Sequence, residues 1–226
     1  VGTTTIDYVA EDAAGHSVSS CSITVTVTDN QDPTVTSCPA AINVNSDAGV
    51  CTATLDPANP VFADNCAVTK VTWTMSGATT GNSPATGLNY VGSTAFNTGT
   101  TTIDYVAEDA AGHSVSSCSI TVTVTDNQDP TVSSCPAARN GNSDAGVCTA
   151  TLDPDNPVFA DNCAVTKVTW TMSGATTGNS AATGLNYVGS TAFNVGTTTI
   201  DYVAEDAAGH SVSSCSITVT VTDNQD

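Results

Sequence analysis

The side chains in this sequence that are best able to do chemistry are carboxylates. They occur in two sets that have the same spacing. Each set has two aspartates just before a proline, one aspartate followed by an asparagine, and a Glu-Asp pair further along. The first set is Asp29, Asp32, Asp64, Asn65, Glu108 and Asp109, and the second is Asp126, Asp129, Asp161, Asn162, Glu205 and Asp206. Calcium takes six to eight oxygen ligands in flexible geometry, which loop carboxylates and carbonyls supply. Each set therefore predicts a calcium site, provided that the fold brings its three segments together.

These sets recur because the chain is built on a 97-residue repeat. Residues 1–32 copy the last third of the unit, with Val1 in place of Thr98. The complete copies differ at six positions, which are Thr36/Ser133, Ile42/Arg139, Val44/Gly141, Ala58/Asp155, Pro84/Ala181 and Thr98/Val195. A catalytic domain needs one pocket, whereas near-identical tandem units suit length, spacing or multivalency. We therefore divide the sequence into the C-terminal part of a repeat at 1–32 and complete repeats at 33–129 and 130–226, and we expect a segment of a longer array.

The net charge argues against two classes of partner. Twenty-two acidic residues face three lysines and arginines, which gives a formal charge of −19. Such a surface repels the phosphates of nucleic acid and of anionic membranes. No apolar run reaches the ~20 residues of a spanning helix. We expect neither nucleic-acid binding nor membrane insertion, and the self-repulsion of the acids favours a divalent cation over a merely soluble acidic surface.

Alternating apolar and polar residues predict β-strands. Every second side chain is apolar over 118–124, and the pattern recurs over 51–55 and 71–75. A period of two indicates half-buried strands, and turn residues interrupt them about every ten to fifteen positions. Roughly seven short strands in about a hundred residues, with a tryptophan on the third, describe an immunoglobulin-like sandwich. The expected strands of the first complete repeat are A at 34–44, B at 50–56, C at 68–75, D and E within 87–96, F at 101–108 and G at 114–125.

Several short motifs in one repeat resemble a known family. They are, in order, Pro33-Thr-Val-Thr-Ser-Cys38-Pro39, Cys51-Thr-Ala53, Asp64-Asn65-Cys66, the run from Gly99 to Gly112, and Cys118-Ser-Ile-Thr-Val-Thr-Val124. This order resembles the hyalin repeat, or HYR domain, over both complete repeats, and residues 1–32 resemble its last third. The resemblance implies immunoglobulin-like modules of extracellular adhesive proteins, which in bacteria occur in tandem on large secreted or surface proteins. The expected fold class is therefore all-β, with tandem immunoglobulin-like β-sandwich domains, disulfides and acidic inter-domain linkers.

The sequence departs from this family in two respects. Each copy has a histidine where the family usually has asparagine, at His16, His113 and His210. In the last repeat Arg139 and Gly141 replace the apolar pair Ile42 and Val44. Because Asn140 and Gly141 form a turn signal, we expect strand A of that repeat to be short, or bulged at an edge.

Four cysteines in each complete repeat indicate disulfides and an oxidising location, because they lack the C-x-x-C spacing of a zinc or redox site. Four cysteines allow three connectivities, which the sequence leaves open. The resemblance favours one of them, since strand A runs parallel to strand G in such a sandwich and two-cysteine relatives keep those two positions. The expected pairs are Cys38–Cys118 with Cys51–Cys66, and Cys135–Cys215 with Cys148–Cys163. Cys21 is left over, and we expect its partner upstream.

The implied fold also places the carboxylates. In such a sandwich the B–C loop, the F–G loop and the incoming linker share one end, so each acidic set should converge there. The linker and the Asp109-x-x-Gly turn resemble the calcium-binding connections of cadherins, in which adjoining domains share ions. Magnesium prefers a tighter octahedron, and zinc prefers sulfur and histidine. The alternative, that acids only initiate turns, is the explanation we accept for Asp47 and Asp56.

An enzymatic function has little support. The run from Gly112 to Ser116 faintly echoes a nucleophile elbow, but it lacks the last glycine and lies between two strands. We predict no catalytic residue and expect that the protein is not an enzyme.

Two functional classes remain. The first is a secreted, extracellular or cell-surface structural protein, a stalk, fibre or filament of rigid calcium-linked modules whose partners are further copies of the repeat. The alternative is an adhesin or a carbohydrate- or protein-binding module, or an accessory region of a large secreted protein, with a glycan or host-surface partner. Near-identity favours the first, because recognition surfaces usually diversify. An adhesin should expose aromatic rings for sugar stacking, for which Tyr90 and Phe96 are candidates while Trp73 belongs to the core.

Overall fold

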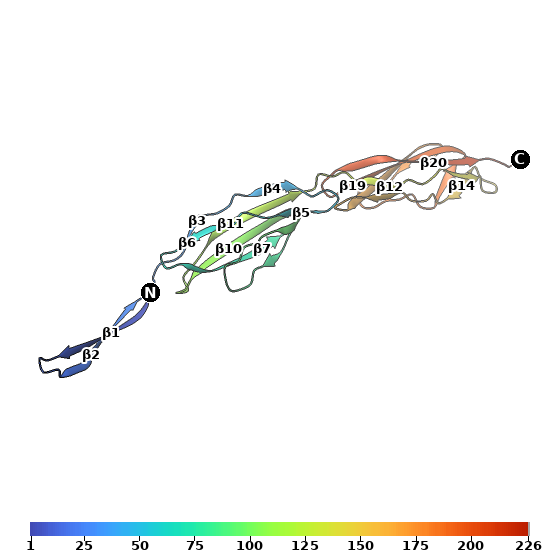
Figure 1. Cartoon of the computed structure of the whole chain (residues 1–226). Helices are drawn as coiled ribbons and strands as arrows, with labels where there is room; N and C mark the ends of the chain where they lie inside the picture. The colour runs from blue at the N-terminus through green and yellow to red at the C-terminus, as the bar shows by residue number, and fades with distance from the viewer. Residues whose placement is uncertain (226) are drawn as a thin grey trace. The chain divides into compact units, whose positions relative to one another are not determined.

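The computed structural model describes residues 1–225, in which every regular element is a β-strand (Figure 1). The predicted all-β class is confirmed. Two compact units form, one from Val1–Asn43 with Thr54–Thr123 and the other from Val44–Ala53 with the residues from Val124 onward. Within 1–225 no helix is long and apolar enough to cross a membrane. Asp226, the last residue of the predicted repeat 130–226, lies outside the described residues.

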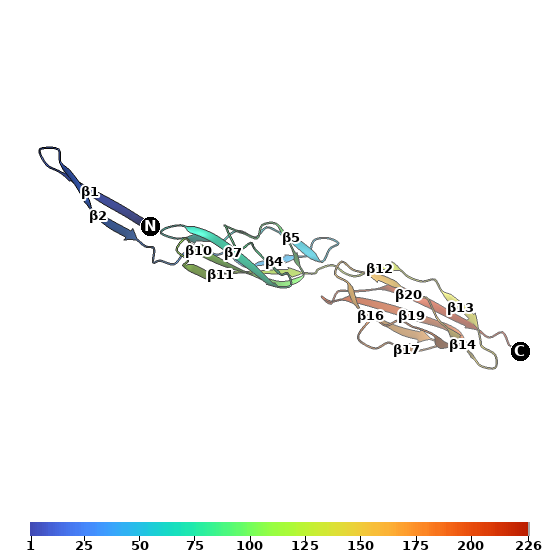
Figure 2. The same cartoon turned by 90° about the horizontal axis from the view of Figure 1, so that it is seen from below.

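The repeat that begins at Pro130 is a two-layered sandwich. One layer is the five-stranded sheet β13-β20-β19-β16-β17, and the pairs β14–β18 and β12–β15 form the other. Figure 2 shows β16, β19 and β20 side by side. The strands are β12 (Thr131–Ser134), β13 (Arg139–Asn142), β14 (Thr149–Leu152), β15 (Val158–Ala160), β16 (Val165–Gly174), β17 (Gly178–Asn179), β18 (Thr191–Asn194), β19 (Gly196–Asp206) and β20 (Ser211–Thr222). Because β13 runs parallel to β20 while the other pairs are antiparallel, the order is immunoglobulin-like.

The repeat that begins at Pro33 has the same strands in the same order. Its sheet is β4-β11-β10-β7-β8, and its pairs are β5–β9 and β3–β6. The strands are β3 (Thr34–Ser37), β4 (Ile42–Asn45), β5 (Thr52–Leu55), β6 (Val61–Ala63), β7 (Val68–Gly77), β8 (Gly81–Asn82), β9 (Thr94–Asn97), β10 (Gly99–Asp109) and β11 (Ser114–Thr125). The predicted strands B, C, F and G correspond to β5, β7, β10 and β11.

Two parts of the strand prediction need correction. Strand A is divided into β3 and β4, since Pro39 lies between them and cannot donate to a ladder. The range 87–96 contains the start of one strand, β9, instead of two. Before β9 the Nδ2 atom of Asn89 donates to the carbonyl oxygens of Thr86 (2.8 Å) and Val71 (3.1 Å), so that a side chain holds a loop there.

Strand β13 is short and lies at an edge, as expected, but it has no bulge and is not shorter than its counterpart. Like β4 it has four residues, and it pairs with β20. The side chain of Arg139 is exposed, and a Cβ on Gly141 would lie 3.1 Å from Leu152, which occupies the space beside it. The two substitutions therefore leave the strand intact.

The core of the second sandwich follows the alternation read from the sequence. Ile200, Tyr202 and Ala204 on β19 are buried, as are Ile217 and other apolar residues of β20. The facing layer adds buried Phe193, and Trp170 is only partly buried against this cluster.

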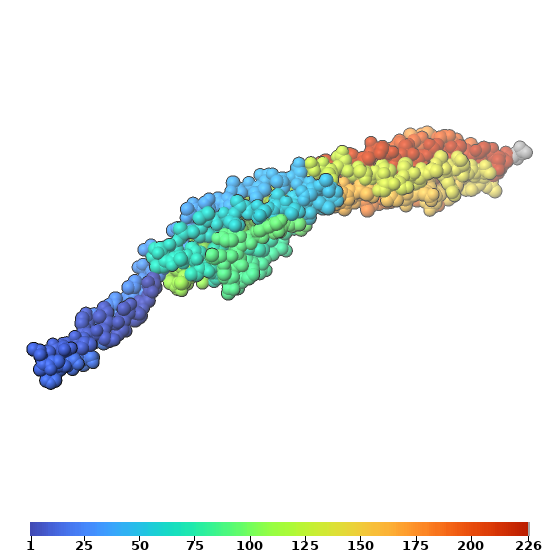
Figure 3. Space-filling view, in the orientation of Figure 1, coloured from blue at the N-terminus to red at the C-terminus, as the bar shows by residue number. Residues whose placement is uncertain are grey.

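The N-terminal hairpin consists of β1 (Gly2–Glu11) and β2 (Ser17–Val27), paired antiparallel. In the space-filling view of Figure 3 the atoms of this hairpin are dark blue. Residues 1–32 are identical in sequence to 195–226, yet Tyr8 is 51% exposed whereas the equivalent Tyr202 is 0% exposed. The hairpin thus has the strand pairing of the repeat without the second layer that buries its apolar face.

One glycine at the end of β16 gives a test of this packing. Gly174 has a φ of 96°, and a Cβ there would lie 2.4 Å from the carbonyl oxygen of Thr197. We expect Gly174→Ala to lower the free energy of unfolding by about 1–3 kcal/mol, measured by urea denaturation, because the strained backbone and the clash add. Gly189→Ala is the control, since Gly189 has open space around it. Equal small effects in both variants would contradict this account.

Candidate functional site

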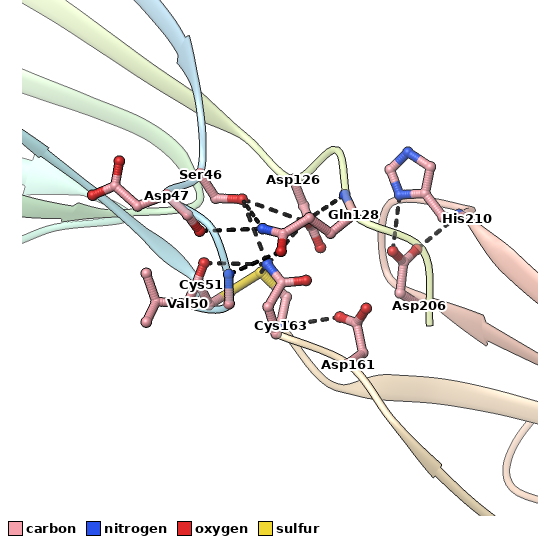
Figure 4. Close-up of a disulfide and its surroundings, with 12 residues drawn as sticks. Ser46, Asp47, Val50, Cys51, Asp126, Gln128, Asp161, Cys163, Asp206 and His210 are labelled. Carbon is pink, nitrogen blue, oxygen red and sulfur yellow. Dashed lines mark hydrogen bonds and ion pairs between the residues drawn. A yellow bond between two sulfur atoms is a disulfide. The ribbon is translucent and has the colours of Figure 1, made fainter. Parts of the chain in front are cut away.

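The second acidic set lies beside a loop of the preceding repeat, and all of these residues belong to the second compact unit (Figure 4). The loop is fixed to the linker that follows β11. Ser46 N donates to the carbonyl oxygen of Thr125 at 2.8 Å. The Gln128 side chain accepts from Gly49 N at 2.9 Å and donates to the carbonyl oxygen of Asp47 at 3.1 Å. One linker glutamine thus closes the loop from both sides.

A turn of the following repeat meets the same loop. Asn162 Nδ2 donates to the carbonyl oxygen of Val50 at 3.2 Å and to Asp126 Oδ1 at 3.0 Å. The next residue, Cys163, is disulfide-bonded to Cys51 with a Cα–Cα distance of 4.6 Å. Ala164 then adopts a φ of 97°, a left-handed conformation that residues other than glycine seldom take. Loop, linker and turn are therefore joined by hydrogen bonds and by one covalent bond.

Three carboxylates from separate segments surround one space at this place. Figure 4 shows Asp126, Asp161 and Asp206 around it. Asp126 and Asp206 are 7% and 2% exposed. Oxygen atoms of these two residues and a ring nitrogen of His210 lie within 4.8 Å of one another. The linker, the turn before β16 and the end of β19 each contribute one acid.

Several oxygens in this cluster have no hydrogen-bond partner among the described residues. They are Asp126 Oδ2, Asp161 Oδ1 and Asn162 Oδ1, and all three are buried. Buried acceptors are normally satisfied, because leaving one unpaired costs free energy. A surplus of buried oxygen acceptors is the donor chemistry that calcium uses.

His210 is hydrogen-bonded to Asp206. Its Nδ1 atom lies 2.9 Å from Asp206 Oδ2, while Oδ1 accepts from the backbone N–H groups of Gly209 and His210. The bond to Asp206 raises the pKa of His210. Burial acts to raise the pKa of Asp206, but the bonds from His210 and Gly209 outweigh it and lower that pKa. Asp206 is therefore kept ionised.

Two members of the predicted set, Glu205 and Asp129, are not among the buried oxygen donors of the cluster. Glu205 forms an ion pair with Lys167 at 2.5 Å, because the register of β16 and β19 places these residues opposite each other. Asp129 is exposed and lines a cleft of about 290 Å³ together with Asp161 and Asn162. The structure thus brings Asp126, Asp161, Asn162 and Asp206 together.

The first acidic set is arranged in the same way within the first unit. Asn65 Nδ2 donates to Asp29 Oδ1 at 3.2 Å, and Asp29 Oδ2 and Asp64 Oδ1 are buried without a partner. Asp29, Asp109 and His113 place ligand atoms within 4.8 Å of one another. Glu108 is paired with Lys70, and Asp32 lines a cleft of about 160 Å³.

The cysteine pairing agrees with the prediction in part. Cys38–Cys118 and Cys135–Cys215 form within their repeats, each with a Cα–Cα distance of 5.5 Å. The expected Cys51–Cys66 and Cys148–Cys163 bonds are wrong, because Cys51 bonds to Cys163 while Cys66 and Cys148 are exposed free thiols.

The physical reason is visible in the second sandwich. Cys163 lies beside the incoming linker, next to Asn162 and its bond to Asp126, whereas the loop before Cys148 contacts Gln225 at the outgoing end. A disulfide requires Cα atoms within about 7 Å, so two cysteines at opposite ends of a domain cannot pair.

The sequence pattern assigned no role in the site to Ser46 or Gln128. A glutamine occupies this linker position in every copy, at Gln31, Gln128 and Gln225, so the position was visible. The partners of Gln128 lie about eighty positions away, at Ser46, Asp47 and Gly49, and only the fold reveals them.

Of the two aromatic candidates for sugar stacking, Tyr90 and Phe96, only Tyr90 is accessible. Phe96 and Phe193 are 0% exposed and belong to the cores. Tyr90 is half-buried, and its counterpart Tyr187 is exposed.

Strand order and disulfides define a class, the disulfide-containing immunoglobulin-like β-sandwich module. Residues 125–221 match the family model of the HYR domain, which confirms the resemblance noted in the sequence. Residues 28–124 repeat the matched segment with only the six substitutions given above.

The chain is similar to hyalin of Strongylocentrotus purpuratus, with 29% identity over 98% of this chain and 16% of hyalin. The chain thus spans about a sixth of that protein's length. The three disulfides fit an oxidising, extracellular environment.

Some solved structures are also similar to this chain. Human mucin-like protocadherin EC1-2 matches 86% of this chain and 100% of its own length, at 12% identity and a TM-score of 0.38. The fibronectin(III)-like modules of Clostridium thermocellum CbhA match 84% of this chain and 94% of theirs, at 14% identity and a TM-score of 0.29. These scores are low, so the fold class depends on the strand order described above.

Proposed function

We propose that this chain is part of a secreted structural protein in which consecutive HYR-type repeats form a calcium-stabilised stalk, fibre or filament. The observation that carries the proposal is the cluster of buried, unpartnered oxygens of Asp126, Asp161 and Asn162 next to Asp206. These groups come from the linker and the following repeat, at the place where a loop of the preceding repeat is bonded.

Calcium suits this donor set. Asp126, Asp161 and Asp206 would hold the ion with Asn162, and the equivalent residues of the first set are Asp29, Asp64, Asp109 and Asn65. The ion supplies positive charge where several carboxylates meet in a chain of formal charge −19. His113 and His210 orient the carboxylates of Asp109 and Asp206 through their Nδ1 atoms.

A bound ion at this place restrains the linker. Asp126 accepts bonds from Asn162 and from the backbone of Gln128, and Gln128 in turn holds the loop at Gly49. An ion on Asp126 therefore fixes the residue that connects loop, linker and turn. A stiff connection repeated along an array gives a rigid element, which is the use that near-identical repeats favour.

Calcium titration of the whole chain tests the proposal. At a free calcium concentration about 100 times Kd, ligand linkage should add ~2.7 kcal/mol to the free energy of unfolding, and excess chelator should remove this gain. Asp126→Asn should weaken binding and shrink the calcium-dependent rise in Tm. Asp201→Asn is the matched control, because Asp201 is an exposed aspartate on β19 away from the cluster. A Tm that is identical in calcium and in chelator, with no heat of binding, would overturn the proposal.

A further inference from the structure

Two of the free thiols are the repeat counterparts of a bonded pair. Cys148 occupies the position of Cys51 one repeat later, and Cys66 occupies the position of Cys163 one repeat earlier. Both are exposed, whereas Cys51 and Cys163 form the disulfide that joins the loop of one repeat to the turn of the next.

The surroundings of Cys148 already have the arrangement found around Cys51. Gly146 N donates to Gln225 Oε1 at 3.1 Å, and Gln225 Nε2 donates to the carbonyl oxygen of Asp144 at 3.0 Å. Ser143 Oγ donates to Asp223 Oδ1 at 3.3 Å. The corresponding contacts at the bonded junction join Gly49 and Asp47 to Gln128, and Ser46 to Asp126. The loop that precedes Cys148 therefore has the same conformation-defining contacts as the loop that precedes Cys51 at the bonded junction.

The surroundings of Cys66 match those of Cys163. Asn65 Nδ2 lies 3.2 Å from Asp29 Oδ1 and 3.4 Å from Cys66 Sγ. The equivalent distances from Asn162 are 3.0 Å to Asp126 Oδ1 and 3.4 Å to Cys163 Sγ. The region around Cys66 has the turn and the linker, and the element it lacks is a loop like the one at 46–51.

We propose that Cys66 and Cys148 each form an inter-repeat disulfide with an adjoining copy of this repeat. Cys148 bonds to the counterpart of Cys163 in the repeat that follows, and Cys66 bonds to the counterpart of Cys51 in the repeat that precedes. The inference rests on the proposed function only in that repeats follow one another in series. Each repeat then has one internal disulfide and shares one with each neighbour.

The bond forms by oxidation of two thiols. The two sulfur atoms join, two protons leave, and two electrons pass to a low-molecular-weight disulfide such as oxidised glutathione, which becomes two thiols. Thiol–disulfide exchange of this kind proceeds in the oxidising environment that the three existing disulfides indicate.

The test extends the chain by one repeat. A copy of residues 130–226 carrying Cys148→Ser is appended after Asp226, and the protein is refolded in a glutathione redox buffer. The parent chain should have the three reactive thiols of Cys21, Cys66 and Cys148. The extended chain should have only two reactive thiols, at Cys21 and Cys66, because Cys148 forms a disulfide with the copied Cys163. Peptide mapping should recover the Cys148 peptide joined to the copied Cys163 peptide.

The control appends the same copy with Cys163→Ser in place of Cys148→Ser, and it should have four reactive thiols. Four thiols in the first extended chain as well, with the copied Cys135–Cys215 bond intact on mapping, would overturn the inference. Thiol counts are taken in chelator and in calcium. If the first extended chain has two reactive thiols but does not bind calcium, the calcium proposal alone is rejected. If it binds calcium but has four reactive thiols, this inference alone is rejected.

Discussion

Cleavage of the peptide linker between the two complete repeats should leave them joined until a reductant is added. The chain offers a direct way to cut it, because dilute acid hydrolyses Asp–Pro bonds preferentially. Four such bonds occur, at Asp32–Pro33, Asp56–Pro57, Asp129–Pro130 and Asp153–Pro154. The fragments within 33–226 are connected by Cys38–Cys118, Cys51–Cys163 and Cys135–Cys215. Non-reducing electrophoresis should therefore show one species containing residues 33–226, and only residues 1–32 should be released.

Whether the two repeats stay joined to each other depends on the Cys51–Cys163 bond alone. Acid suppresses disulfide exchange, because the thiolate is the attacking species. In Cys51→Ser the same cleavage should give two species, 33–129 and 130–226, each held by its internal disulfide. Separation of the repeats in the unreduced wild-type chain would show that Cys51 and Cys163 are not bonded to each other.

Loss of the disulfide inside the second sandwich should cost roughly 4–5 kcal/mol of unfolding free energy, by the chain-entropy relation for a loop of this length. Cys135 and Cys215 are separated by 80 residues. Cys135 is exposed while Cys215 is fully buried, so Cys135→Ser removes the cross-link without placing a new polar group in the core. Because a domain is stable by only about 5–15 kcal/mol, the variant should lose a large part of its stability.

Urea denaturation of the whole chain, followed by the fluorescence of its tryptophans, measures this loss. Cys21→Ser serves as the control, since Cys21 is an exposed free thiol on the hairpin and its replacement should have no measurable effect. A cost below about 1 kcal/mol for Cys135→Ser would show that the entropic relation does not describe this loop.

The β-sandwich could be predicted because short stretches of the sequence specify its strands and its buried residues. Alternation over residues 200–204 places Ile200, Tyr202 and Ala204 in the core, and the structure buries all three. The resemblance supplied the parallel run of the first and last strands, and with it the Cys38–Cys118 pair. The division of strand A also has a local cause, because Pro39 has no N–H group to donate to a strand ladder. A proline does not indicate, however, which sheet the chain joins after the break.

The junction could be predicted only in part, because its contacts are not local. The acidic segments identified the correct end of the domain, yet the sequence did not show that Lys167 would pair with Glu205, which depends on strand register. The near-identity of the repeats hid the true partner of Cys51. Cys66 and Cys163 occupy the same position in successive copies, so no local pattern distinguishes a bond of 15 residues from one of 112.

The Cys51–Cys163 bond also bears on how such an array would respond to tension. In an array with a disulfide at every junction, a continuous covalent path enters each repeat at the counterpart of Cys163 and leaves it at the counterpart of Cys148. Within the repeat this path follows the segment equivalent to 148–163, which runs between opposite ends of the sandwich. Its 15 peptide steps reach at most about 50 Å when extended, against roughly 330 Å for the whole 97-residue repeat. Unfolding the sandwich would therefore release little length, and the array's resistance to pulling would come from covalent bonds instead of from its small hydrophobic cores.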